Sequence, residues 1–178
     1  LELPPEEKFS YSSGGTQLLG LVLERAINGR SITSYLQENV WNTVGMEYSG
    51  SWSTDWSTNA IERTFCCLNA AAIDYAKLGR LYSHKGQWNG EQIVSSDWVN
   101  VSTQVDTSRG SDAKYQYQWW LPSEDGDFIA KGLLGQYIYV DPSRDLIIVR
   151  LGRSRGAIKS WPDLFRQLAK YYPKVGEI

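Results

Sequence analysis

The hydrophobic pattern of this chain changes from helical to strand-like at about residue 115, and that change most constrains its fold. Aromatic and polar side chains alternate over most of residues 115–120, as they do in a strand. Further strands are predicted at residues 128–130, 136–140 and 146–151. Because residues 146–151 are almost continuously apolar, we expect them to form a central strand that is covered on both faces.

Helical periodicity dominates before that point. Residues 12–27 have so little polar surface that they predict a buried helix, capped by Ser12 or Ser13 and ended by Asn28-Gly29. Further helices are expected from Ser31 to about Gly45, over residues 69–82, near residues 95–99 and over residues 161–171. Helices, then an antiparallel meander, then a helix indicate an α+β fold, an antiparallel sheet flanked by helices.

Composition sets the class of protein. With 178 residues, 42% apolar and 21% charged, the chain resembles an ordinary globular protein, and we expect residues 1–178 to have no internal domain boundary. A net charge of -2 gives no electrostatic case for nucleic acid. No apolar run reaches the roughly 18 residues that a membrane span needs. The N-terminus has no signal-peptide pattern and no initiator Met, so we expect the chain to begin inside a longer protein.

The two cysteines, Cys66 and Cys67, are adjacent. Because neighbouring cysteines rarely bond to each other, we expect two small buried residues at the entry to a helix; their redox state stays open. His84 is the single histidine, and its setting beside Lys85 and Gly86 predicts a surface position. These residues supply neither a zinc ligand set nor a Ser-His-Asp triad, and nothing in the sequence indicates a metal or an organic cofactor.

Tyr11-Ser12-Ser13 is the first candidate for chemistry. A tyrosine just before a helix lies near the positive end of the helix dipole, which favours a phenolate, and a phenolate can act as a general base. The alternative is a core tyrosine followed by a serine cap. Taken alone, these three residues favour the alternative.

Residues 132–136, Gly-Leu-Leu-Gly-Gln, open a predicted strand. A glycine there lets a substrate or another backbone come close, and a backbone N–H at such an edge can stabilise an oxyanion. The alternative is a bulge or bend in the sheet. Ser111 and Lys114 have the Ser-x-x-Lys spacing of a nucleophile and its base, but they precede a strand rather than lie on a buried helix, so we expect a solvated loop.

Aromatic residues are the last candidate. Residues 47–66 are polar, without sustained periodicity, and predict a long loop, which is often functional. Trp52 and Trp56 of this loop could line a substrate groove, whereas the tryptophans of the predicted strands and helices, Trp98, Trp119 and Trp120, are expected in the core. A sugar-binding module would also use exposed aromatic residues, so this feature selects no class of protein.

In combination and in order, these segments resemble the serine β-lactamase and penicillin-binding-protein superfamily, in particular the class C-like branch with its esterases and 6-aminohexanoate-dimer hydrolases. The Tyr11 element resembles the Tyr-x-Asn/Ser motif of that superfamily. The other matching segments are its long helix (67–81), the turn after it (86–94) and two strands (117–120 and 135–142). The resemblance covers nearly the whole chain and implies a β-lactamase-like fold.

The resemblance also implies roles for residues. Tyr11 would be the general acid and base, and Ser13 would stand beside it in place of the family's Asn or Ser. Gly135 and Gln136 would match the Lys-Thr-Gly strand, with the Gln136 N–H as an oxyanion donor. That position reads Leu133-Leu134-Gly135, so a β-lactam carboxylate would lose its usual partners, which favours a small-molecule ester or amide as the substrate.

The family's Ser-x-x-Lys helix precedes its tyrosine, and only ten residues precede Tyr11. The fold is therefore expected to be incomplete: the chain is a C-terminal fragment, a partial gene product or a complete non-catalytic relative. A fragment would expose an apolar sheet edge and helix face, and would need the missing N-terminal segment in cis or as another chain. A binding or structural module with the same fold is the alternative function. The resemblance alone suggests an exported or periplasmic protein.

Overall fold

The computed structural model describes residues 4, 7–56, 58 and 60–177. It divides into two compact units, Ser10–Asp74 and a second unit that joins Leu1–Phe9 to Tyr75–Ile178. That the whole chain is part of one domain stays a prediction. Among the described residues, no helix is long and apolar enough to cross a membrane.

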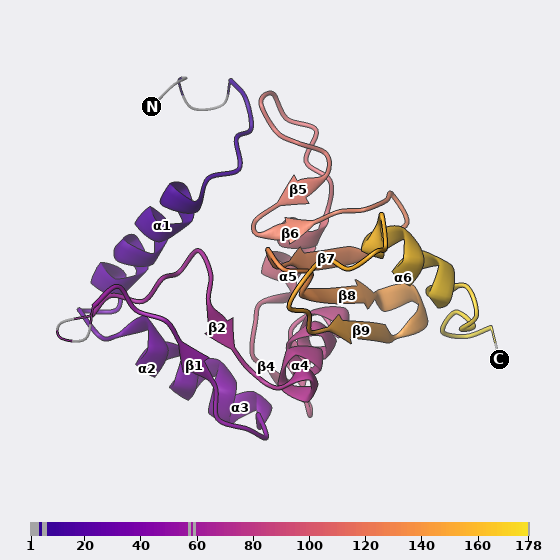
Figure 1. The fold of residues 1–178 in the computed structure, drawn as a ribbon. Helices are drawn as coiled ribbons and strands as arrows, with labels where there is room; N and C mark the ends of the chain where they lie inside the picture. The colour runs from indigo at the N-terminus through magenta and orange to yellow at the C-terminus, as the bar shows by residue number, and fades with distance from the viewer. Residues whose placement is uncertain (1–3, 5–6, 57, 59, 178) are drawn as a thin grey trace. The chain divides into compact units, whose positions relative to one another are not determined.

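The larger unit is built on a five-stranded antiparallel meander, which confirms the predicted α+β class (Figure 1). Its strands follow one another in both sequence and space: β5 (Tyr115–Gln116), β6 (Trp119–Trp120), β7 (Phe128–Lys131), β8 (Tyr137–Asp141) and β9 (Leu146–Arg150). β7 pairs with β8 from Phe128↔Val140 to Lys131↔Tyr137, and β8 pairs with β9 over five residues.

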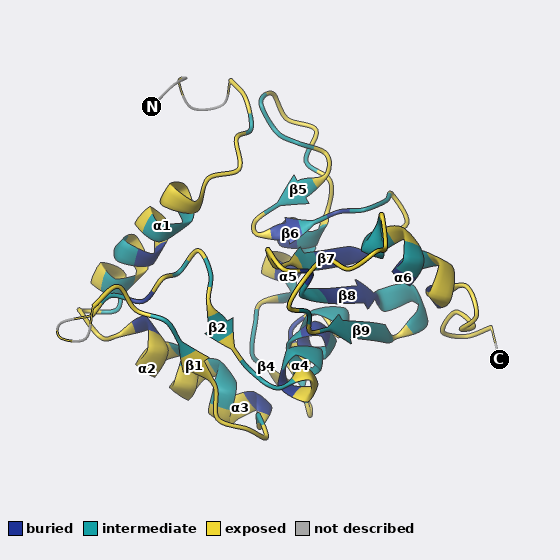
Figure 2. Cartoon of the chain, viewed as in Figure 1, coloured by how far each residue is buried: buried dark blue, intermediate teal, exposed yellow. Residues whose placement is uncertain are grey.

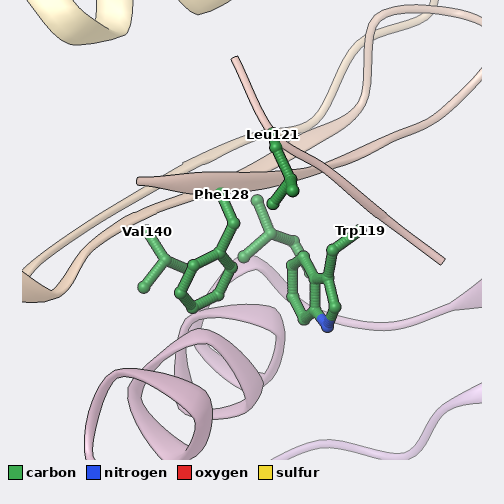
Figure 3. Close-up of a cluster of buried hydrophobic side chains, with 5 residues drawn as sticks. Trp119, Leu121, Phe128 and Val140 are labelled. Atoms are coloured by element: carbon green, nitrogen blue, oxygen red, sulfur yellow. The ribbon is translucent and has the colours of Figure 1, made fainter. Parts of the chain in front are cut away.

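Helices cover both faces of this sheet. Because successive strand residues point to opposite faces, Ile138 and Val140 belong to one buried cluster and Tyr139 to another. The first cluster, with Trp119, Leu121 and Phe128, packs against α4 (Ala72–Ser83) (Figure 3). The second packs against Phe165 and Ala169 of α6 (Trp161–Ala169), the predicted C-terminal helix.

Two strand predictions were wrong. Residues 115–120 form two short strands rather than one, because Tyr117 and Gln118 both adopt positive φ and reverse the chain. Residues 146–150 form the edge strand β9 rather than a central one, and all five are only half-buried. The apolar run therefore marked a strand with partial cover, not a strand enclosed on both faces.

The remaining elements of this unit follow the sequence closely. Asn89-Gly90 joins the hairpin β3 (Gln87–Trp88) and β4 (Glu91–Gln92), with φ of 50° and 90°. Two helices complete the unit, α5 (Ser96–Thr103) and the short 3-10 helix η2 (Pro142–Arg144). His84 is exposed as predicted, and its Nε2 lies 2.9 Å from Asp145 Oδ1. Trp98, expected in the core, is 45% exposed.

The smaller unit contains three short helical segments, one long helix and a two-stranded hairpin. These elements are α1 (Ser13–Ala26), α2 (Ile32–Leu36), the π-helix η1 (Gln37–Trp41), α3 (Asn42–Val44), β1 (Ser51–Trp52) and β2 (Leu68–Asn69). Gly45 ends α3 in the left-handed conformation, as its position in the sequence predicts. The predicted helix over residues 69–82 begins later, at Ala72, because Asn69 belongs to strand β2.

The first helix is placed correctly, but the prediction that it is buried was wrong. Gly20 is its single buried residue among those described (Figure 2). Leu18, Leu19 and Val22 are each more than half exposed. The helix therefore carries an apolar face that no described residue covers.

Candidate active site

Tyr11 and Ser13 lie at the start of α1. Ser12 is the N-cap residue, and its Oγ accepts a hydrogen bond of 3.1 Å from the Gly15 N–H. Ser13 is the first helical residue and is exposed. The Tyr11 side chain is 53% exposed, so it is not a core tyrosine. The predicted serine cap and an accessible phenol thus occur together at the positive end of a helix.

The segment 61–64 fixes α1 to the rest of the smaller unit. Gln17 on α1 donates from Nε2 to the Glu62 carbonyl at 3.0 Å and accepts from the Thr64 N–H at 3.1 Å. The Thr64 hydroxyl donates to the Thr16 carbonyl at 3.0 Å. These bonds orient the helix from its second turn, close to Tyr11.

Trp52 and Trp56 also belong to the smaller unit, and they differ in exposure. Trp56 is 76% exposed, as a loop residue in contact with a ligand would be. Trp52 is half-buried on β1, and its indole N–H donates to the carbonyls of Arg63 and Cys66 at 3.0 and 2.9 Å. Trp52 borders a cavity of about 40 Å³, too small for more than water. Its N–H is occupied, so it has only its ring to offer to a substrate.

The prediction for Cys66 and Cys67 was wrong. The two residues form a disulfide with each other, and they lie in the loop before β2 rather than at the entry to a helix. Cys67 is exposed and has a φ of 74°. Its carbonyl accepts from the Ser53 N–H at 3.1 Å, and Cys66 binds the Trp52 indole as described. The disulfide-bonded pair is therefore hydrogen-bonded to Trp52 and to the next residue, Ser53.

Gly135 and Gln136 belong to the larger unit, in the turn between β7 and β8. The Gly135 N–H donates to the Gly132 carbonyl at 3.2 Å, and the Gly132 N–H donates to the Gln136 carbonyl at 2.8 Å. Gly135 has a φ of 81°. This is a three-residue hairpin loop with a glycine bulge, the alternative that the sequence left open. We call residues 132–136 the β7–β8 turn.

Neighbouring side chains hold the β7–β8 turn in place. Gln136 accepts from the Leu134 N–H at 3.0 Å and donates from Nε2 to the Gly152 carbonyl at 2.8 Å. Arg150 donates to the Gly135 carbonyl, and its guanidinium lies 4.0 Å from the centre of the Trp161 ring. A Cβ at Gly135 would lie 2.9 Å from the Ser154 carbonyl oxygen, so glycine is required there.

Two N–H groups of this turn are unused. Among the described residues, those of Leu133 and Gln136 donate to no acceptor. Unpaired N–H groups on a fixed turn are the donors that an oxyanion needs. The geometry is therefore compatible with the expected role of Gln136, and it adds Leu133, which the sequence analysis did not single out.

Lys131 is a further residue that the sequence analysis missed. It ends β7 next to the turn, and its ammonium lies 4.3 Å from the centre of the Trp120 ring. Partial burial, and secondarily the positive charge of Lys114, lowers the pKa of Lys131, although the residue as a whole is exposed. Its place at the end of an alternating strand, directly before the glycine, was the available signal. Ser111, by contrast, lies in a loop as expected, where its hydroxyl binds the Asp106 and Ser108 carbonyls.

The part of the chain that the structure describes contains no evident metal site. No three side chains of His, Cys, Asp or Glu gather there in a way that could hold an ion. The candidate residues are divided between the two units: Tyr11 and Ser13 belong to the smaller one, and the β7–β8 turn and Lys131 belong to the larger one.

Comparison with known proteins decides the family. The β-lactamase family model matches residues 1–172. This chain belongs to the β-lactamase family. A curated 6-aminohexanoate-dimer hydrolase of Paenarthrobacter ureafaciens is 26% identical over 167 residues. This alignment covers 88% of this chain and 40% of the relative.

Solved structures agree on the fold. A candidate 6-aminohexanoate-dimer hydrolase of Bacillus anthracis superposes with a TM-score of 0.81 and 29% identity, over 95% of this chain and 45% of that one. A β-lactamase of Mycobacterium bovis has a TM-score of 0.71 and 20% identity, over 96% of this chain and 67% of that one. The β-lactamase-family chain thus spans less than half the length of the two 6-aminohexanoate-dimer hydrolases.

Proposed function

We propose that this chain is the C-terminal part of one β-lactamase-like domain, in a serine hydrolase that cleaves small amides or esters through an acyl-enzyme. The observation that carries the proposal is an exposed Tyr11 before the capped helix α1, in a chain of this family. The nucleophilic serine and its lysine lie in a segment outside this chain. The likeness to 6-aminohexanoate-dimer hydrolases supports a linear amide as the substrate.

Tyr11 moves the proton in this mechanism. As a phenolate it takes the proton of the serine hydroxyl while the serine oxygen attacks the carbonyl carbon. It then gives that proton to the leaving nitrogen or oxygen as the tetrahedral intermediate collapses. Water repeats the sequence on the acyl-enzyme and releases the acid. Ser13 stands beside Tyr11 and hydrogen-bonds the groups that exchange the proton.

The β7–β8 turn stabilises negative charge in this mechanism. The N–H of Gln136 donates to the oxyanion of each tetrahedral intermediate, and it is unused among the described residues. Gly135 is buried and supplies the positive φ that shapes this turn, and Trp52 and Trp56 offer ring surface to the apolar chain of the substrate. Removing one such donor typically costs about 10²–10³ in kcat.

A comparison of two tyrosine variants tests the proposal. The full-length protein is incubated with a fluorophosphonate probe, and its hydrolysis of 6-aminohexanoate dimer and of a p-nitrophenyl ester is measured. We expect labelling of a serine outside this chain, and a loss of about 10²–10⁴ in kcat for Tyr11→Phe. Tyr48→Phe is the control, since Tyr48 is a similarly exposed tyrosine of the same unit.

Two results would contradict different parts of the proposal. Unchanged hydrolysis by Tyr11→Phe removes Tyr11 from the mechanism. A full-length protein without an upstream Ser-x-x-Lys, and without labelling or hydrolysis, is instead a non-catalytic module that uses the same fold.

A further inference from the structure

A polar cavity of about 200 Å³ lies in the larger unit beside α6, at the opposite end of the sheet from the β7–β8 turn. Asp127 directly precedes β7 and Asp141 ends β8, one residue beyond the pair Phe128↔Val140. The turn joins the other ends of these strands. A four-residue strand is about 13 Å long, so the cavity is separate from the candidate active site.

The floor of the cavity contains a carboxylate with an unused oxygen. The Asp127 side chain is 3% exposed, and its Oδ1 accepts from the Ser123 hydroxyl. Its Oδ2 is buried and receives no hydrogen bond from any described residue; the nearest cation, Arg166 Nε, is 3.4 Å away. Such an oxygen is costly to bury unless a donor reaches it.

Tyr139, next to Asp127 on the floor, is held in its neutral form. Burial, then the negative charges of Asp127 and Asp141, and then a side-chain hydrogen bond with Asp127 raise the pKa of Tyr139 far above its ordinary value. The floor therefore carries negative charge from its aspartates and none from the phenol.

The cations divide into paired and unpaired ones. Arg166 bonds Asp125 at 2.7 Å, and Arg144 bonds Asp141 at 3.1 Å and the Tyr172 carbonyl. Lys170 and Lys174 line the same cavity and are exposed. In the described part of the chain, no carboxylate pairs with either ammonium. The cavity thus has at its floor a carboxylate oxygen that accepts no hydrogen bond and lies 3.4 Å from Arg166 Nε, and it has unpaired cations at its rim.

We propose that this cavity binds a small zwitterion that carries a primary ammonium and a carboxylate. The ammonium donates to Asp127 Oδ2, and the carboxylate pairs with Lys170 and Lys174. A simple anion would meet the aspartates, and a simple cation would meet the lysines, so neither matches both ends. The volume lies below the about 300 Å³ at which sites for drug-sized ligands begin, as suits a small metabolite. Binding here is independent of the hydrolytic function.

Calorimetric titration of the intact protein tests this site with three probes of one chain length. They are 6-aminohexanoate, which has both charges, hexanoate, which has only the carboxylate, and hexylamine, which has only the ammonium. We expect 6-aminohexanoate to bind at least tenfold more tightly than either other probe. Asp127→Asn should weaken 6-aminohexanoate and hexylamine at least tenfold and leave hexanoate unchanged.

A second variant addresses the rim and does not depend on the buried aspartate. Lys170→Gln combined with Lys174→Gln alters two exposed positions, and should weaken 6-aminohexanoate and hexanoate but not hexylamine. Lys159→Gln, an exposed lysine outside the cavity, is the control and should change none. The proposal is overturned if 6-aminohexanoate binds no better than hexanoate, if it does not bind, or if its binding survives the double lysine variant.

Discussion

Glu62 is a buried carboxylate that connects two segments of the smaller unit. It is 6% exposed, and its Oε1 accepts from the Thr33 N–H at 2.9 Å. Burial acts to raise the pKa of Glu62, but the hydrogen bonds from Thr33 outweigh it, and the pKa lies below its ordinary value. The unfolded state therefore binds more protons, so this contribution is present above the unfolded pKa and is lost as pH falls through the folded one.

Glu62→Gln should consequently lower stability at pH 7 and have little effect in acid. We expect a loss of about 1–2 kcal/mol at pH 7, since a hydrogen bond to a charged group is replaced by one to an amide. Thermal unfolding at pH 7 and pH 3 measures the two differences. Glu91→Gln, at an exposed carboxylate on β4, should change stability by less than about 0.5 kcal/mol. An equal loss for Glu62→Gln at both pH values would show that its charge is not involved.

Residues with local partners were predictable from the sequence, and residues with distant partners were not. The Ser12 cap depends on Gly15, three residues away, and was predicted. Lys131 lies against the ring of Trp120, which the neighbouring strand β6 places beside it, and this contact could not be predicted. The Cys66–Cys67 disulfide is an exception, because its partners are adjacent; a general rule about neighbouring cysteines gave the wrong result.

At the scale of elements, Gly79 determines how closely α4 approaches the sheet. A Cβ there would lie 2.9 Å from Ile147 Cγ2 and 3.2 Å from Ile138 Cγ2. We expect Gly79→Ala to destabilise the protein, because overpacking costs about 1–3 kcal/mol and helix propensity returns only about 1 kcal/mol. Gly14→Ala on α1 meets its nearest atom, Ser12 Oγ, at 3.6 Å and should be neutral or slightly stabilising. Equal melting temperatures for the two variants would contradict this close packing.

The positions of most helices and strands follow from periodicity, but their burial does not. The pattern of residues 12–27 and of residues 146–150 correctly gave a helix and a strand. Both were expected to be enclosed, and both are partly exposed. An apolar pattern shows that a segment can pack against another element, but it does not show whether that element lies in the same chain.

At the scale of the molecule, the exposed face of α1 and the open edge of β9 can be explained by the greater length of the relatives. The chain spans 40% of the curated relative and 45% of the Bacillus anthracis structure. One side of β9 has no strand partner among the described residues, and Leu18, Leu19 and Val22 of α1 are exposed. We infer that the remainder of a longer protein covers the helix face and extends the sheet at β9, in cis or as a second chain.

The isolated 178-residue chain should therefore bind anilinonaphthalene sulfonate and associate as its concentration rises, and both effects should decrease when the upstream segment is supplied. Dye fluorescence and analytical ultracentrifugation measure them. Leu18→Gln combined with Val22→Gln removes two neighbours on one helix face and should reduce dye binding without changing the β9 edge. A chain that is monomeric, melts cooperatively and binds no dye would show that these surfaces need no partner. Dye binding that the upstream segment leaves unchanged would show that another partner covers them.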